Sequence, residues 1–423
     1  MTEEWRGIMQ FVRTAELKPG MRLAKPIYNK RGVLLYERGT KLTAQGIESI
    51  KNFGLIGIFT LEPAEPLPPL SKEDLEFEQF QTVYVFQLKE NLDKIQAETA
   101  PDTLKELAVS ILNRYGSRDS KMNFTQNLRS SADFVYKHSI STAILTSMLC
   151  NALHVAPECR IGLVTAALLM DIGYLYVPQA ILDKGDNLSA DEKDFIQSNL
   201  ERGYEALRPR YNDYHLPQDT LELIHYKVFS GSHTLKLKDS PKISRVLIEI
   251  LRVADKFDRL TAMDISHPPI SEIAAMNYFT EHKKDYNTKV VSALAECIHI
   301  LPTGACVDLS DGEKALVLSE NAADFSHPMI LRFRDHRVFD LSDLETVQQF
   351  HITDIMRTMD NRIAIDADTL KQFKADKHLL ETMERFRKNK ERIASRNKSL
   401  DSVIDLNAFA FDGFDDVKNP SDL

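Results

Sequence analysis

Leu168-Leu169-Met170-Asp171-Ile172-Gly173-Tyr174 is the stretch that decides the fold, because an apolar run ends in it at a single carboxylate. Residues 161–170 are almost wholly apolar, which predicts a helix buried inside a larger helical core. The carboxylate of Asp171 suits a divalent metal. The neighbouring Met170 offers only a thioether, which is a soft and weak ligand for a hard cation.

Helices are predicted on both sides of this stretch. Residues 139–153 carry apolar side chains along one face, and residues 243–260 form another apolar helix, which contains Asp255. Ser189-Ala190-Asp191-Glu192 matches a capping box and should begin a helix that runs toward Leu207. The fold class expected from this pattern is mainly α, with a helical bundle over residues 131–301.

Smaller units are predicted to flank the bundle. Residues 1–62 alternate short apolar strands with one helical segment, and Asp311-Gly312 between two apolar runs is a hairpin signal. We therefore expect a small N-terminal α/β domain and a C-terminal β module. The full set of predicted segments is an N-terminal domain at 1–62, a proline-rich linker at 63–72, a helical connector at 73–130, the bundle at 131–301, a β-rich module at 302–365, a charged helix at 366–398 and an acidic disordered tail at 399–423.

Composition excludes some classes of function. The chain has 423 residues, of which 43% are hydrophobic and 27% charged, as in ordinary globular proteins. Its 62 acidic and 53 basic residues give a formal net charge of −9, which argues against general nucleic-acid binding. We find no signal peptide and no predicted membrane span, and the four cysteines lack CxxC spacing, so we expect a cytoplasmic protein with reduced thiols.

Several separated motifs, in the right order, resemble the HD-GYP family, a branch of the HD metal phosphohydrolases. The similarity covers roughly residues 9–340. The segment from Val253 to Thr261 closely matches the family's Val-Ala-Asp-x-Phe-Asp-x-Leu-Thr. The other matching stretches are His138-Ser139, Met170-Asp171-Ile172-Gly173, Ile181-Leu182-Asp183-Lys184 and Ile224-His225-Tyr226-Lys227.

Complete members of this family hydrolyse cyclic di-GMP with two or three metal ions, which activate a hydroxide and neutralise the phosphodiester. By resemblance, four residues fall on metal-ligand positions, namely His138, Asp171, His225 and Asp255. The resemblance also marks five substituted positions, at which ligands, the lysine after the His-Asp doublet or the Gly-Tyr-Pro signature are missing: Met170, Tyr174, Asn199, Tyr226 and His233. No catalytic set is intact, so the resemblance implies a degenerate member.

The four retained residues leave two interpretations open. They form either a vestigial cluster whose members hydrogen-bond one another, or a single-metal site in which His138, Asp171 and Asp255 share one Fe, Mn or Zn ion. The interpretation we favour is a catalytically inactive protein of bacterial signalling that senses a nucleotide or docks a protein partner. The alternative is an active metal-dependent phosphohydrolase, or cyclic di-GMP phosphodiesterase, with a reduced metal site.

A third hypothesis is a purely architectural protein. The partners that these hypotheses imply are a cyclic dinucleotide, a protein, or a second copy of the chain that pairs through apolar stripes on residues 72–115. No partner is expected among membranes.

Overall fold

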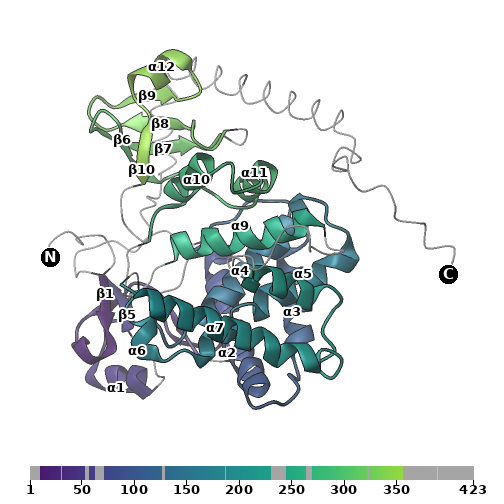
Figure 1. The fold of residues 1–423 in the computed structure, drawn as a ribbon. Helices are drawn as coiled ribbons and strands as arrows, with labels where there is room; N and C mark the ends of the chain where they lie inside the picture. The colour runs from purple at the N-terminus through teal and green to yellow at the C-terminus, as the bar shows by residue number, and fades with distance from the viewer. Residues whose placement is uncertain are drawn as a thin grey trace, which may run out of the picture. The chain divides into compact units, whose positions relative to one another are not determined.

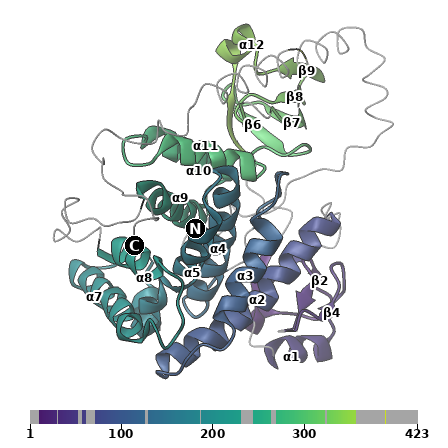
Figure 2. The ribbon, with the colours of Figure 1, turned by 90° about the vertical axis from the view of Figure 1, so that its right-hand side faces the viewer.

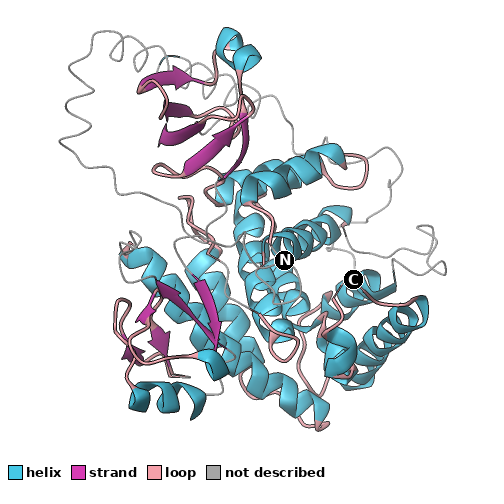
Figure 3. Ribbon diagram, turned by 90° about the vertical axis from the view of Figure 1, so that its left-hand side faces the viewer, coloured by secondary structure: helices cyan, strands magenta, loops and turns pink. Residues whose placement is uncertain are grey.

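The computed structural model describes most of the chain, in ten stretches: residues 10–29, 31–52, 57–61, 71–125, 129–185, 187–229, 244–262, 269–321, 324–355 and residue 388. Two compact units follow one another, a larger one up to Cys306 and a smaller one from Val307 to Thr353. The expected fold class is confirmed, since helices form the body and strands lie near the two ends of the described chain (Figures 1 and 3). Most of the predicted linker, the charged helix and the acidic tail lie outside the described residues.

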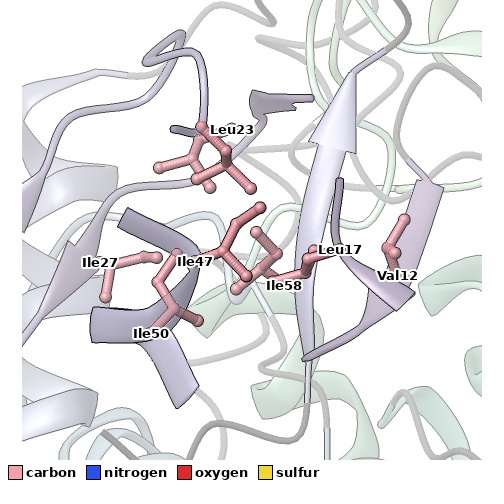
Figure 4. Close-up of a cluster of buried hydrophobic side chains, with 8 residues drawn as sticks. Val12, Leu17, Leu23, Ile27, Ile47, Ile50 and Ile58 are labelled. Carbon is pink, nitrogen blue, oxygen red and sulfur yellow. The ribbon is translucent and has the colours of Figure 1, made fainter. Parts of the chain in front are cut away.

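The first part of the larger unit is a small α/β arrangement. A three-stranded antiparallel sheet has the order β1-β5-β2, and a separate hairpin pairs β3 with β4. The helix α1 packs its apolar side under these strands, and Figure 4 shows Ile47 and Ile50 of this helix among the buried side chains of strands and turns. The elements are β1 (Gln10–Arg13), the 3-10 turn η1 (Thr14–Glu16), β2 (Arg22–Leu23), β3 (Ile27–Tyr28), β4 (Leu34–Tyr36), α1 (Ala44–Asn52) and β5 (Gly57–Leu61).

The rest of the larger unit is helical, and α4 is its central helix. Of the sixteen side chains of α4 from Val135 to Cys150, all but that of Lys137 are buried, because α4 packs against α2, α3, α5, α9 and α11. The helices are α2 (Lys72–Gln96), α3 (Leu104–Tyr115), α4 (Phe134–Ala152), α5 (Pro157–Leu169), η2 (Ile172–Tyr176), α6 (Gln179–Leu182), α7 (Ala190–Leu207), η3 (Arg208–Arg210), α8 (Thr220–Phe229), α9 (Arg245–Thr261), α10 (Glu272–Glu281) and α11 (Thr288–Cys297).

Two local predictions are confirmed in this body. Ser189 and Glu192 form both hydrogen bonds of the capping box that begins α7. The apolar run ahead of Asp171 is the buried helix α5, with each side chain from Gly162 to Leu169 inside. By length and composition the segment Pro157–Tyr176 would also suit a membrane span, but 67% of its most apolar window is buried within the unit, as in a core helix.

The helices α2 and α3, which fall in the predicted connector at 73–130, pack against the other helices of the larger unit. Figure 2 shows them beside α4 and α5, and several of their apolar residues, including Leu88, Leu92, Leu107 and Ile111, are fully buried, whereas Val109 is 38% exposed. Part of the apolar surface on which we based pairing of two copies is therefore covered within the chain. Homodimerisation through residues 72–115 stays a prediction.

The smaller unit is a five-stranded sheet of order β10-β6-β7-β8-β9. Asp311-Gly312 forms the predicted turn between β6 and β7, where Gly312 adopts a positive φ of 83° that favours glycine. The guanidinium of Arg332 lies over the rings of Phe339 and Phe350, at 4.6 and 4.9 Å from their centroids. The elements are β6 (Cys306–Leu309), β7 (Lys314–Ser319), β8 (Met329–Arg332), β9 (Arg337–Asp340), α12 (Leu344–Gln349) and β10 (Ile352–Ile355).

Candidate functional site

Three helical elements bring a histidine and three carboxylates together in the core of the helical body. His138 projects from the middle of α4 and is 1% exposed. Its Nε2 atom lies 3.0 Å from Oδ2 of Asp171, at the start of η2, and 3.0 Å from Oδ1 of Asp255 on α9. Its Nδ1 atom lies 2.5 Å from Oδ2 of Asp258, one turn further along α9. Three of the four predicted ligand positions therefore converge.

Close backbone packing positions Asp171. A Cβ atom added to Gly173 would lie 2.4 Å from the carbonyl oxygen of Asn199 and 2.4 Å from Cα of Leu200, both on α7. A Cβ atom on Gly203 of the same helix would lie 2.6 Å from Cα of Gly173. Two glycines thus let η2 lie directly against α7, and this contact fixes the turn from which Asp171 reaches His138.

Two cationic side chains bind the same carboxylates. Arg259 donates from Nη2 to Oδ2 of Asp171 at 2.9 Å and from Nε to Oδ1 of Asp255 at 3.0 Å. Lys227, on α8, donates from Nζ to Oδ2 of Asp255 at 2.5 Å. Both oxygens of Asp255 therefore accept hydrogen bonds from protein donors, and so does the oxygen of Asp171 that faces His138.

Asp258 has a counter-ion of its own. Arg129 donates from Nη1 and Nη2 to the two oxygens of Asp258, at 2.6 and 2.7 Å, and the side chains are 4% and 0% exposed. Arg129 also donates to the hydroxyl of Ser141 on α4. This bidentate pair, buried from solvent, satisfies a carboxylate that would otherwise be costly to bury.

The charges shift the pKa values of the cluster in a consistent way. Burial and Arg259 lower the pKa of His138, but its hydrogen bonds to Asp171, Asp255 and Asp258 outweigh them and raise it to about 9. Burial raises the pKa of each of the three carboxyls, but the cations and His138 outweigh burial and lower it below the ordinary value. At neutral pH the carboxylates are ionised, and both nitrogens of His138 carry a proton and donate.

The other predicted positions do not join the cluster. His225 packs its ring against Tyr204 and Phe229, with centroids 5.2 and 4.6 Å away, and is not among the converging ligand atoms. Asn199 is buried and donates from Nδ2 to the carbonyl oxygen of Phe195, one turn earlier on α7. Tyr226 is half-buried on α8. His233 lies outside the described residues.

The two substituted positions around Asp171 are filled by packed side chains. Met170 is buried at the end of α5. The ring of Tyr174 lies edge-on to Phe134, with centroids 5.0 Å apart, and its own centroid is 5.7 Å from the guanidinium carbon of Arg259. Tyr174 therefore fills the space beside Arg259, as expected for a packing role.

Four basic residues lie in the segment from α6 to η3, namely Lys184, Arg202, Arg208 and Arg210. Lys184 pairs with Glu192, Arg208 with Glu205 and Arg210 with Glu98, while Arg202 lies over the ring of Tyr176. Three of the four charges are thus already neutralised by carboxylates within the chain.

The residues present do not fit the metal centre that the resemblance implies. Among the described residues, His138, Asp171 and Asp255 form the group whose ligand atoms all lie within 4.8 Å of one another. Three ligand atoms are too few for two ions. No catalytic step is therefore assigned to a metal here.

Sequence reasoning missed the residues that neutralise the carboxylates. The spacing of Asp255 and Arg259, four positions apart on one helix, was a signal for the pair within α9. No comparable local signal connects Lys227 to Asp255 or Arg129 to Asp258, because 28 and 129 positions separate these partners.

Comparison with known proteins agrees with this architecture. A family model described as an HD domain matches residues 123–290. A cyclic di-GMP phosphodiesterase from Pseudomonas aeruginosa is 23% identical over 239 residues, which are 56% of this chain and 56% of that protein, so the chain spans about half the length of this relative. A solved HDG"Y"P protein from Bdellovibrio bacteriovorus aligns over 68% of this chain and 98% of its own, at 16% identity and a TM-score of 0.39.

The HD domain covers the segments that carry His138, Asp171 and Asp255, and the relative that aligns with the chain is a cyclic di-GMP phosphodiesterase. The chain therefore contains an HD domain over residues 123–290, and it is similar over about half of its length to a cyclic di-GMP phosphodiesterase.

Proposed function

We propose that this chain is a degenerate HD-GYP protein that acts in bacterial signalling by binding a cyclic dinucleotide or a protein partner, without hydrolysing the nucleotide. The observation that carries the proposal is the short ligand set. His138, Asp171 and Asp255 converge, whereas Met170, Asn199, Tyr226 and His225 supply no further ligand to them. A cyclic dinucleotide is the ligand class we favour because the Pseudomonas relative is named as acting on one.

The remaining groups are poor catalysts by themselves. A general base should have a pKa near the working pH, but the cations hold the pKa of Asp171 and Asp255 below the ordinary carboxyl value. His138 is buried, and its two nitrogens face the carboxylates of Asp258 and Asp255. Among the described residues, the cluster thus offers no evident general base, which supports the proposal.

Turnover and metal content test the proposal together. The full chain is purified without chelators, its Fe, Mn and Zn are measured by elemental analysis, and cyclic di-GMP is incubated with it in excess Mn²⁺. We expect sub-stoichiometric metal and intact nucleotide by chromatography. Turnover that disappears in the Asp171→Ala variant would overturn the proposal.

Calorimetry separates the two forms of the proposal. Saturable binding of cyclic di-GMP, but not of GMP, supports a nucleotide sensor. The absence of any binding removes the sensor and leaves a protein-docking or architectural role.

The alternative is a phosphohydrolase with a single metal. It is favoured by one observation, the convergence of His138, Asp171 and Asp255 within 4.8 Å. One tightly held Fe, Mn or Zn ion per chain, together with metal-dependent turnover, would establish this alternative in place of the inactive protein.

A further inference from the structure

We propose that Arg259 and Lys227 are a built-in replacement for a divalent cation in this HD domain. Together they supply two positive charges, and each nitrogen that contacts the carboxylates lies 2.5 to 3.0 Å from an oxygen. Arg259 and Lys227 add positive charge to the cluster, and this is separate from the loss of metal ligands on which the proposed function rests.

The replacement is geometric as well as electrostatic. A metal held by His138, Asp171 and Asp255 would use Nε2, Oδ2 and Oδ1 of these residues, which are the atoms that face one another in the cluster. Arg259 donates to two of these three atoms, the Oδ2 of Asp171 and the Oδ1 of Asp255. A cation at this point would have to displace the guanidinium and would be repelled by its charge.

The two side chains also make the connections between helices that a metal would make. Arg259 ties α9 to the junction of α5 and η2 through Asp171, and Lys227 ties α8 to α9 through Asp255. The carboxylates that they bind are 3% and 7% exposed, so without these cations two ionised groups would be buried beside each other. The negative charges of Asp171 and Asp255 are therefore neutralised by side chains of the protein itself.

The inference predicts that removing the cations creates a metal site. In the double variant Arg259→Ala/Lys227→Ala, the side chains of Asp171 and Asp255 lose their counter-ions but keep their positions near His138. We expect this variant to bind about one Mn²⁺ per chain, at least roughly tenfold more tightly than the wild type. Binding is measured by calorimetry and by the electron paramagnetic resonance signal of free Mn²⁺.

Thermal unfolding gives a second readout that needs no enzymatic activity. Mn²⁺ should raise the Tm of the double variant, because a ligand that binds only the folded state stabilises it. The Tm of the wild type should change neither with Mn²⁺ nor with EDTA. Adding Asp171→Asn to the double variant should abolish Mn²⁺ binding, since it removes a charged ligand.

Arg252→Ala/Lys256→Ala is a matched control on α9. It removes the same two residue types, and Arg252 is 34% exposed, against 33% for Arg259. Arg252 pairs with Glu249, and Lys256 lies over the ring of Tyr278, away from the three ligand atoms. This control should gain no metal.

Three results would overturn the inference. They are a folded double variant that binds Mn²⁺ no better than the wild type, equal binding by the control, and stoichiometric Mn²⁺ on the wild type. If the double variant does not fold even with Mn²⁺, the single variant Arg259→Gln carries the same comparison, because it removes the charge that contacts both Asp171 and Asp255 and leaves Lys227 in place. A wild type without turnover whose variants gain no metal removes this inference and leaves the proposed function standing.

Discussion

Arg129→Met removes the guanidinium from a carboxylate that is completely buried. Asp258 is 0% exposed and accepts two hydrogen bonds from Arg129, at 2.6 and 2.7 Å. Removing one partner of a buried pair costs about 3–5 kcal/mol, because the other charge stays buried. Asp258 keeps its contact with Nδ1 of His138, so we expect the low end of this range, about 3 kcal/mol.

The loss is measured by urea unfolding, followed by far-UV circular dichroism. Hydrogen exchange in α4 and α9 reports on the helical body by itself, which is useful in a chain with two compact units. The matched control is Arg208→Met, which removes an exposed arginine that lies 3.4 Å from Glu205. Its effect should stay within about 0.5 kcal/mol.

A second substitution separates lost charge balance from lost packing. In the Arg129→Met background, Asp258→Asn should recover part of the stability, because it removes the uncompensated charge. If Arg129→Met destabilises the protein by less than about 1 kcal/mol, or if Asp258→Asn adds a further loss, the reasoning about this buried pair is refuted.

Three further predictions concern neighbouring features. The pKa of His138 in the folded protein is about 9, above the ordinary value of 6.5, so the contribution of His138 to stability should be complete below pH 6.5 and lost as the pH rises through 9. NMR titration of the imidazole checks the pKa. The variant His138→Gln should lose less stability than the wild type between these two pH values. Gly173→Ala should lower the Tm and cost about 1–3 kcal/mol, because the new methyl group would meet the backbone of α7 at 2.4 Å; an unchanged Tm would contradict this contact. Ser189→Ala should cost about 1 kcal/mol by removing the capping hydrogen bond of α7, with weaker amide protection in its first turn, whereas Ser198→Ala within the same helix should not affect that turn.

Much of the fold was predictable because its signals are local. The apolar run before Asp171, the capping box at Ser189 and the Asp311-Gly312 turn each depend on a few neighbouring residues, and the structure has all three. The boundaries were less accurate: α4 begins at Phe134, five residues before the predicted start at 139. An apolar pattern indicates which residues are buried more clearly than where a helix begins.

The candidate site was predictable only in part because its chemistry depends on distant partners. The motifs identified His138, Asp171 and Asp255, and these residues do converge. His225 fits the motif equally well, yet its ring packs on Tyr204 and Phe229. Whether a basic residue on an amphipathic helix faces water or a carboxylate depends on how the helices pack, and the sequence does not encode that locally.

In the signature Asp171-Ile172-Gly173, the glycine and the aspartate have different roles, because Gly173 serves the backbone contact with Gly203. Neither position has room for a methyl group, since the added atom would overlap the backbone of the facing segment. The close contact between two backbone segments thus requires a glycine at position 173, whether or not the neighbouring side chains are catalytic. Sequence searches that rely on this glycine will therefore find proteins that share the fold. The charged residues around the aspartate are needed to distinguish catalytically active members from inactive ones.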